Sequence, residues 1–319
     1  MKKILWLLLL LPGIAAGQIY IDSYKFAAPA PSGDLILDSI PGALVAYSLR
    51  KLDKDYTGNV LTIRKDNGDT LNVGFSGDYI DTVAIKNHCG TGAGDSCRVR
   101  RWYDQSGNAR NLAQSTVSRQ PLIMVDGVLM RSNGDVCIDF VNQFLDVEAG
   151  EVSTSGAITM FFALVFDLQI TSTLNPIQVF HSAKSGDEAR NDFNFGPYTS
   201  ALTNERESWI YYLAPNVFGI GQTTSNVAAD DYIYSLWAPH TSTTAKMYRN
   251  NTNLTISTAG AVLNFAPSGV FRFGAYSSAT NVASSFFNGK AYEVIIYNSD
   301  KDADVNQINT NINSFYSIY

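Results

Sequence analysis

The 319-residue sequence predicts an all-β fold, an antiparallel β-sandwich closed by a short C-terminal helix. Short runs rich in aromatic and β-branched residues recur along the chain, and Gly, Asn and Asp separate them, as in a sandwich. The tail differs, because from Asp302 onward apolar residues recur at helical spacing. These residues are Val305, Ile308, Ile312 and Phe315.

The first 17 residues have the layout of a secretory signal peptide. Lysines precede an apolar run from Ile4 to Leu11, and small residues follow up to Gly17. A membrane-spanning helix needs about 20 apolar residues, so we expect export with cleavage near Gly17; an uncleaved hydrophobic anchor is the alternative. Residues 18–41 contain prolines and little periodicity, which predicts an extended lead-in to a sandwich over residues 42–319.

The next segments contain two hairpin signals. Gly42–Leu52 fits a strand or a helical turn, and its periodicity does not decide between them. Residues 60–75 predict a hairpin around Asp66-Asn67-Gly68-Asp69, and residues 122–130 predict another around Asp126-Gly127.

Ile158–Asp167 is the most apolar run after the N-terminus and has no polar face, which predicts a central strand covered on both sides. Further strands are predicted at 136–140, 144–147, 178–181, 209–213, 232–237, 245–249, 270–275 and 291–297.

The most distinctive stretch is Cys89–Gln114, CGTGAGDSCRVRRWYDQSGNARNLAQ. An apolar run ends at Trp102, which we expect in the core, and enters a turn-forming cluster. Asp104 in this corner is predicted to accept backbone N–H groups rather than to catalyse. Cys89 and Cys97 bracket a Gly-rich loop and are close enough to form a disulfide, and Cys137 is expected to be a buried free thiol.

This stretch resembles the strand-and-loop signature of the catalytic domain of family 54 α-L-arabinofuranosidases, a β-sandwich of the concanavalin/laminin-G type. The resemblance implies a carbohydrate ligand. A retaining glycosidase needs two carboxylates about 5–5.5 Å apart. The family's nucleophile is a Glu in a strand motif resembling Asp-Met-Glu-Asn-Asn, for which we find no counterpart; the nearest acidic candidates are Glu205 and Glu207. The family's acid is an Asp after a Gly-rich strand end, and the matching stretch, Phe273–Asn281, contains no carboxylate.

We therefore expect an exported or surface- or particle-displayed, noncatalytic module that binds glycan or mediates attachment. One alternative is a divergent α-L-arabinofuranosidase-like retaining glycosidase. The other is a structural or assembly protein of an envelope, appendage or virus particle, which would form a homo-oligomer. The predicted localisation is secreted, periplasmic or cell-surface, and the alternative is a virus particle surface or a membrane anchor.

Sugar recognition uses aromatic faces together with converging polar groups. Trp and Tyr on sandwich strands more often belong to the core, so each candidate competes with that interpretation. The candidate ligand-binding residues are Tyr276, Asn281, Trp209, Tyr211 and Trp237.

The charge pattern argues against nucleic acid as a partner. The formal net charge is −6 at pH 7, and the one dense cationic cluster is Arg98, Arg100 and Arg101 with Arg110 nearby. We interpret this cluster as alternate outward positions on one strand.

No cofactor or metal is predicted. His88, His181 and His240 are isolated and lack ligand spacing. The turns Asp66–Asp69 and Asp230-Asp231 offer the hard oxygen ligands that calcium prefers, but they are also ordinary turn sequences.

Overall fold

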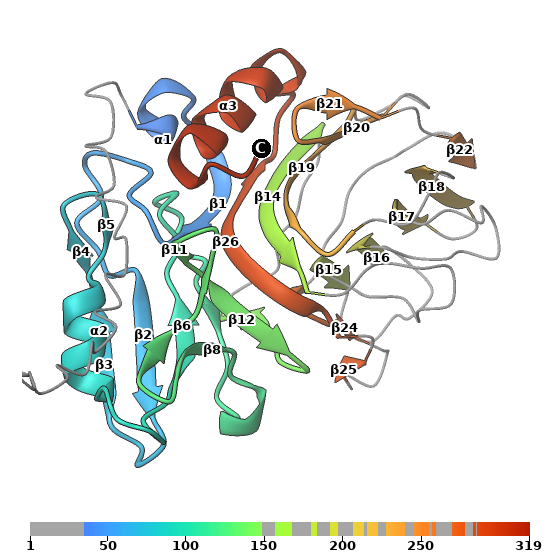
Figure 1. Ribbon diagram of the computed structural model, residues 1–319. Helices are drawn as coiled ribbons and strands as arrows, with labels where there is room; N and C mark the ends of the chain where they lie inside the picture. The colour runs from blue at the N-terminus through green and yellow to red at the C-terminus, as the bar shows by residue number, and fades with distance from the viewer. Residues whose placement is uncertain are drawn as a thin grey trace, which may run out of the picture.

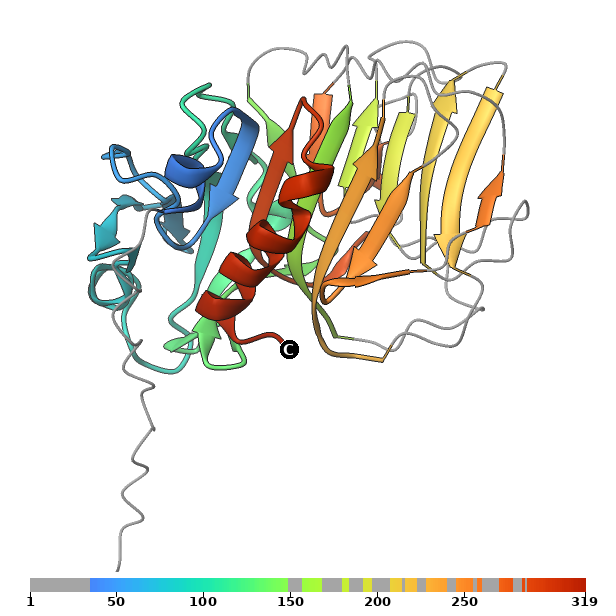
Figure 2. The ribbon, with the colours of Figure 1, turned by 90° about the horizontal axis from the view of Figure 1, so that it is seen from above.

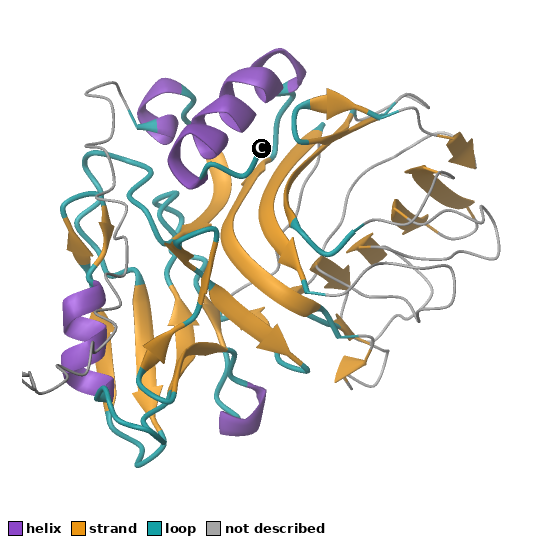
Figure 3. Cartoon of the chain, in the orientation of Figure 1, coloured by secondary structure: helices purple, strands orange, loops and turns teal. Residues whose placement is uncertain are grey.

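The computed structural model shows an antiparallel β-sandwich with a C-terminal helix, which confirms the predicted fold class (Figure 3). It describes residues 35–148, 157–167, 180–183, 192–196, 207–213, 216–222, 228–239, 245–254, 257–259, 270–277, 283–284 and 286–319. The signal-peptide prediction, Glu205 and Asn281 lie outside these residues.

The first sheet is built around β26, so we call it the β26 sheet (Figure 1). One edge of β26 pairs with β1 and β12, and its other edge pairs with β14, from which the order continues through β19 and β20 to β21. The bounds are β1 Ala43–Ser48, β12 Ile138–Val141, β14 Ile158–Phe166, β19 Asp231–Ala238, β20 Lys246–Arg249, β21 Thr252–Asn253 and β26 Asn288–Tyr297.

The second sheet, the long sheet, has the order β22-β18-β17-β16-β15-β23-β13-β7-β6-β2-β3. Its bounds are β2 Leu61–Lys65, β3 Thr70–Val73, β6 Cys97–Trp102, β7 Leu112–Ala113, β13 Leu145–Val147, β15 Phe180–Ala183, β16 Asp192–Gly196, β17 Glu207–Leu213, β18 Asn216–Gln222, β22 Ser257–Ala259 and β23 Val270–Phe273.

Strand β8 (Leu122–Val125) joins the two sheets, because it pairs with β6 on one side and β12 on the other. Short pairs flank this framework. They are β9 (Val128–Leu129) on β8, β4 (Phe75–Ser76) with β5 (Tyr79–Ile80), β10 (Arg131–Ser132) with β11 (Asp135–Val136), and β24 (Tyr276–Ser277) with β25 (Ala283–Ser284).

Strand β14 separates two hydrophobic cores, as its apolar run predicted. Every one of its residues is buried. Phe162 and Leu164 belong to the main core, whereas Phe161 and Ala163 belong to a second core. Because strand side chains alternate between faces, a strand buried on both sides needs apolar residues at nearly every position. Thr159 is the polar exception, and its hydroxyl donates to the Ser299 carbonyl.

Helices cover the second core (Figure 2). Helix α3 (Val305–Tyr316), preceded by the 3-10 turn η2 (Asp302–Asp304), buries three of the four apolar positions predicted from its spacing, Val305, Ile308 and Ile312. The fourth, Phe315, is partly buried against the same core, and Tyr316 is buried beside it. Helix α1 (Ile36–Ser39) lies beside it and buries Ile36 and Leu37. The lead-in was predicted to be extended, so α1 is a difference, and its cause is the apolar surface that α1 covers. Among the described residues, no helix is both long and apolar enough to span a bilayer.

Local signals account for the segments before and after the Cys89–Cys97 loop. The predicted disulfide Cys89–Cys97 is present and joins the end of α2 (Thr82–Cys89) to the start of β6. The predicted β8–β9 hairpin turns at Asp126 and Gly127, both with positive φ, as a two-residue hairpin requires. A Cβ on Gly127 would lie 2.4 Å from the carbonyl of Thr91, so only glycine fits. Helix α2 is an additional element that the sequence pattern did not predict. Asp81 caps its first turn by accepting the N–H groups of Val83 and Ala84.

We expect Asp139 on β12 to make stability depend on pH. Its side chain is buried, and Oδ1 has no hydrogen-bond partner in the described part of the chain. Burial raises the pKa of Asp139, although the charge of Lys290 opposes this effect. Because the folded pKa exceeds the unfolded one, the stabilising contribution is present at acidic pH and is lost as the pH rises through the folded pKa.

Urea unfolding of the wild type and Asp139→Asn between pH 3.5 and 7 checks this expectation. The free energy of unfolding of Asp139→Asn should fall below that of the wild type by less at pH 7 than at acidic pH. Parallel pH profiles would contradict the prediction.

Candidate functional site

Of the predicted ligand-binding residues, Trp237 on β19 is the one whose side chain is described. It is half-buried, and its indole N–H donates to Asp300 Oδ1 at 2.8 Å. The Lys246 ammonium lies 5.0 Å from the centre of the ring. A hydrogen bond from Lys246 to Asp302, 2.5 Å long, raises the pKa of Lys246 and holds this cation in place. A sugar ring would therefore have to stack on the opposite face of the indole.

Strand β17 carries three candidate positions, Glu207, Trp209 and Tyr211, at alternate residues. The register relates them to described side chains. Trp209 pairs with Phe195 of β16, and Phe195 pairs with Phe180 of β15. Phe180 in turn pairs with Phe273 of β23. Directly opposite residues share a face, and Phe273 is buried in the main core. The backbone pairing therefore puts Trp209 in register with a core residue, and the functional roles of Glu207, Trp209 and Tyr211 stay predictions.

Tyr276 follows a constrained turn after β23. Gly274 has φ +98°, and a Cβ there would lie 2.7 Å from the Gln143 carbonyl oxygen, so the turn requires glycine. Ala275 is fully buried, and Tyr276 then pairs with Ser284 in β24–β25.

The opposite side of the long sheet, which we call the outer face, carries a row of polar residues in register. Arg101 lies opposite Thr62 on one side and opposite Ala113 on the other, and the row continues through Asp146 to Arg272. The polar residues of this row are Asn72, Thr62, Arg101, Asp146 and Arg272.

Arg272 and Asp146 form a two-pronged ion pair in this row. Nε donates to Oδ1 at 2.6 Å and Nη2 donates to Oδ2 at 2.9 Å. The Phe144 ring lies 4.2 Å from the guanidinium carbon, and Arg272 is 6% exposed. Its Nη1 has no hydrogen-bond partner among the described residues. The sequence does not reveal this pair, because its members are 126 residues apart and each alone looks like an ordinary strand charge.

A second ion pair on the outer face joins Arg101 to Glu148. Arg101 also lies over the Tyr103 ring, whose hydroxyl contacts Thr62 Oγ1 at 3.0 Å. Partial burial raises the pKa of Tyr103, but hydrogen bonds with Thr62 and Arg101 and the Arg101 charge outweigh burial and lower it.

The Asp104 carboxylate is structural, as predicted. Oδ1 accepts the backbone N–H groups of Ala46 and Ser106, both at 2.9 Å. Oδ2 accepts the Ser106 hydroxyl at 2.8 Å and the Arg110 N–H at 3.0 Å. The carboxylate is 4% exposed and its acceptor sites are occupied, which leaves it no access to a substrate. Trp102 is fully buried, which confirms its prediction.

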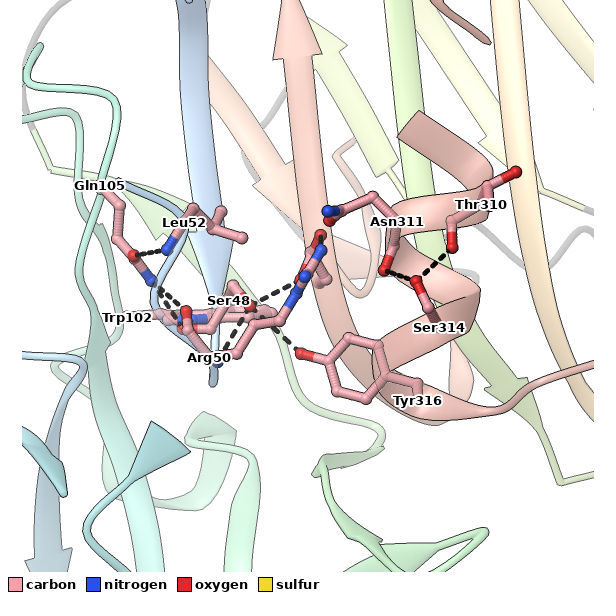
Figure 4. Close-up of polar contacts among 10 residues, drawn as sticks. Ser48, Arg50, Leu52, Trp102, Gln105, Thr310, Asn311, Ser314 and Tyr316 are labelled. Atoms are coloured by element: carbon pink, nitrogen blue, oxygen red, sulfur yellow. Dashed lines mark hydrogen bonds and ion pairs between the residues drawn. The ribbon is translucent and has the colours of Figure 1, made fainter. Parts of the chain in front are cut away.

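Gln105 connects the same turn to β1 and the residues that follow it (Figure 4). Its amide donates to the carbonyls of Ser48 and Arg50 and accepts the Leu52 N–H. Arg50 in turn binds Glu293 of β26, and Ser48 bridges Glu293 to Tyr316 of α3. Glu293 is fully buried and paired with Arg50.

In each of the two turns considered for calcium, side-chain oxygens already accept hydrogen bonds from the protein. In the first, Asn67 Oδ1 accepts the Asp69 N–H. In the second, Asp231 accepts hydroxyl groups from Ser132 and Tyr292. No group of three or more His, Cys, Asp or Glu side chains is arranged to hold a metal in the described part of the chain.

Among solved structures, a GH54 α-L-arabinofuranosidase soaked with a cyclic sulfate inhibitor matches 88% of this chain with a TM-score of 0.63 and 16% identity. An arabinofuranosidase complexed with arabinofuranosyl-α-1,2-xylobiose matches the same share with a TM-score of 0.61 and 14% identity. No protein-family model matches, and a search of curated proteins found no match.

These likenesses define the class of fold: the chain is a β-sandwich similar to the one in GH54 α-L-arabinofuranosidases. The chain spans 64% of the length of those structures.

Proposed function

We propose that this chain is an exported, noncatalytic module that binds glycan. The observation that carries the proposal is a fold similar to carbohydrate-cleaving enzymes over 88% of the chain, in which the stretch Phe273–Asn281 holds no carboxylate. The resemblance assigns the family's catalytic acid to that stretch. Here Gly274 is followed by the buried Ala275, which cannot protonate a leaving group.

The sequence supports the same conclusion about the nucleophile. The resemblance assigns that role to a Glu in a strand motif like Asp-Met-Glu-Asn-Asn, and the sequence contains no counterpart of this motif. A retaining mechanism requires a carboxylate nucleophile.

The described carboxylates of the outer-face row and its neighbourhood are already paired. Asp146 binds Arg272 and Glu148 binds Arg101. A carboxylate whose oxygens already accept hydrogen bonds from a guanidinium is held in one position, so these groups suit the recognition of hydroxyl groups better than proton transfer. The disulfide Cys89–Cys97 supports export, because such bonds persist in oxidising compartments.

Incubation with an aryl α-L-arabinofuranoside and with arabinoxylan tests for catalysis. We expect no release of arabinose by the folded wild type. Release that disappears in Glu207→Gln or Glu205→Gln would overturn the noncatalytic role and establish a retaining glycosidase.

Retention on immobilised arabinoxylan tests for binding. We expect retention of the wild type and about tenfold weaker retention of Tyr276→Ala, since an aromatic platform contributes about 1 kcal/mol or more. Tyr319→Ala is the matched control, because Tyr319 is 49% exposed at the C-terminus. A folded protein that forms a stable oligomer but is not retained on any glycan would favour an assembly role instead.

A further inference from the structure

The arginines of β2 and β6, near Trp102, do more than line one solvated strand face, because the strand pairing brings them together. Arg64 on β2 lies directly opposite Arg98 on β6. Like charges in directly opposite positions destabilise a sheet. The Arg98 guanidinium is 3.9 Å from the Asp66 carboxylate, whereas Arg64 makes none of the ion pairs found among the described residues. The β2–β6 ladder therefore holds positive charge that its neighbours do not neutralise.

An irregularity in the same ladder adds a further cation. Ile63 pairs with Val99 and Thr62 pairs with Arg101, so Arg100 is an extra residue in β6. Such a bulge re-aims side chains next to functional sites. Arg100 is exposed and, in the described part of the chain, has no ion pair.

The positive charge continues from β6 across the outer face. Arg98 donates to the carbonyl of Gln120, next to Arg119, and Arg119 lies 5.1 Å from the Phe286 ring. Phe286 in turn lies near Phe144, which packs on Arg272. Arg101 Nε and Arg272 Nη1 are buried donors without a partner among the described residues, and an unmet buried donor costs about 1–3 kcal/mol.

The charge of this surface contrasts with the charge of the chain. The whole sequence carries a net charge of −6. The outer face nevertheless holds five arginines, Arg64, Arg98, Arg100, Arg101 and Arg272, with Arg119 in the neighbouring turn Val117–Arg119. The described carboxylates beside them are Asp66 and Asp69 of the β2–β3 turn, Asp146 and Glu148. A cationic surface on an acidic protein is complementary to an anionic ligand, and guanidinium groups match the planar carboxylate in two-pronged geometry.

We propose that the outer face binds an acidic polysaccharide, one whose sugars carry carboxylate or sulfate groups, through Arg64, Arg98 and Arg100. This inference rests on the proposed function, because it specifies the class of glycan. The arginines of β2 and β6 lie along two extended, neighbouring strands, so a polymer of repeating negative charge can contact several of them at once.

Retention of the full chain on immobilised polygalacturonate, chondroitin sulfate, neutral arabinoxylan and duplex DNA tests the inference. We expect retention on polygalacturonate or chondroitin sulfate that weakens as salt is added. The affinity of the double variant Arg98→Gln/Arg100→Gln for the acidic glycan should fall by about tenfold or more, because two charge-assisted contacts are lost. Its thermal unfolding should stay close to that of the wild type, since Arg100 is exposed. Arg131→Gln, an exposed arginine on β10, is the matched control.

The outcomes separate this inference from the proposed function. Retention on arabinoxylan without retention on either acidic glycan overturns the inference and leaves the proposed function intact. No retention on any glycan overturns both. Retention on duplex DNA as strong as on the acidic glycans would show a general anion-binding surface and overturn the glycan assignment. A folded double variant that binds the acidic glycans like the wild type would also overturn it.

Discussion

Glu293→Ala is expected to lower the free energy of unfolding by about 3–5 kcal/mol, the range for removing one partner of a buried ion pair. Arg50 Nε lies 2.7 Å from Oε2, and Nη2 lies 2.9 Å from Oε1. Glu293 is fully buried and Arg50 is 4% exposed. The variant would leave the guanidinium charged, because its pKa is too high for it to neutralise itself inside the protein.

The same substitution should loosen helix α3. Ser48 donates to Glu293 Oε2 at 2.8 Å and lies 3.2 Å from the Tyr316 hydroxyl near the end of α3 (Figure 4). Hydrogen exchange should therefore report a less protected α3 together with the global loss of stability seen in urea.

A double variant distinguishes the cost of leaving Arg50 buried and unpaired from the net contribution of the Arg50–Glu293 ion pair. Arg50→Met/Glu293→Leu should recover much of the stability, because well-packed apolar residues often replace a buried ion pair with little loss. A loss below about 1 kcal/mol in Glu293→Ala would contradict the prediction and indicate that water reaches Arg50.

Asp104→Ala should lower the free energy of unfolding by about 3 kcal/mol, since hydrogen bonds to a charged group contribute about 1.5–3 kcal/mol each and are not additive. The carboxylate accepts four hydrogen bonds: the one from the Ala46 N–H ties the turn after β6 to β1, and the other three, from Ser106 and Arg110, hold the turn itself. Removing it leaves buried backbone N–H groups without acceptors.

Urea unfolding of Asp104→Ala, Asp104→Asn and Asp126→Asn checks this prediction. Asp104→Asn should show an intermediate loss, because it keeps one acceptor oxygen. Asp126→Asn should change stability by less than about 0.5 kcal/mol, since Asp126 accepts one N–H in an exposed turn where φ is +50°. Equal stability of Asp104→Ala and the wild type would show that water replaces the carboxylate.

Features governed by neighbouring residues were predictable from the sequence. The β8–β9 hairpin follows from Asp126-Gly127, because few residues accept positive φ. The burial of β14 on both faces follows from an apolar residue at nearly every position. The structural role of Asp104 follows from its place at a strand-to-turn corner, where a short carboxylate reaches backbone N–H groups.

Other local features escaped prediction. Helix α2 carries a weak apolar pattern, and its main signal was Asp81, a side chain that caps helices and also occurs in turns. Residues 36–40 were expected to be extended, but residues 36–39 form helix α1. This helix covers the second core on the β26 sheet, and the sequence does not show that this apolar surface is there.

The sequence alone determined the fold class, the disulfide, the main hairpins and the C-terminal helix, because each depends on periodicity or turn chemistry within a few residues. Only the tertiary structure decided which charges meet. It brings Arg50 to Glu293 across 243 residues and Arg272 to Asp146 across 126. It also places Arg64 opposite Arg98 on the outer face. The physical reason is that strand pairing is non-local: the register between distant strands sets which side chains share a face, and composition does not encode that register.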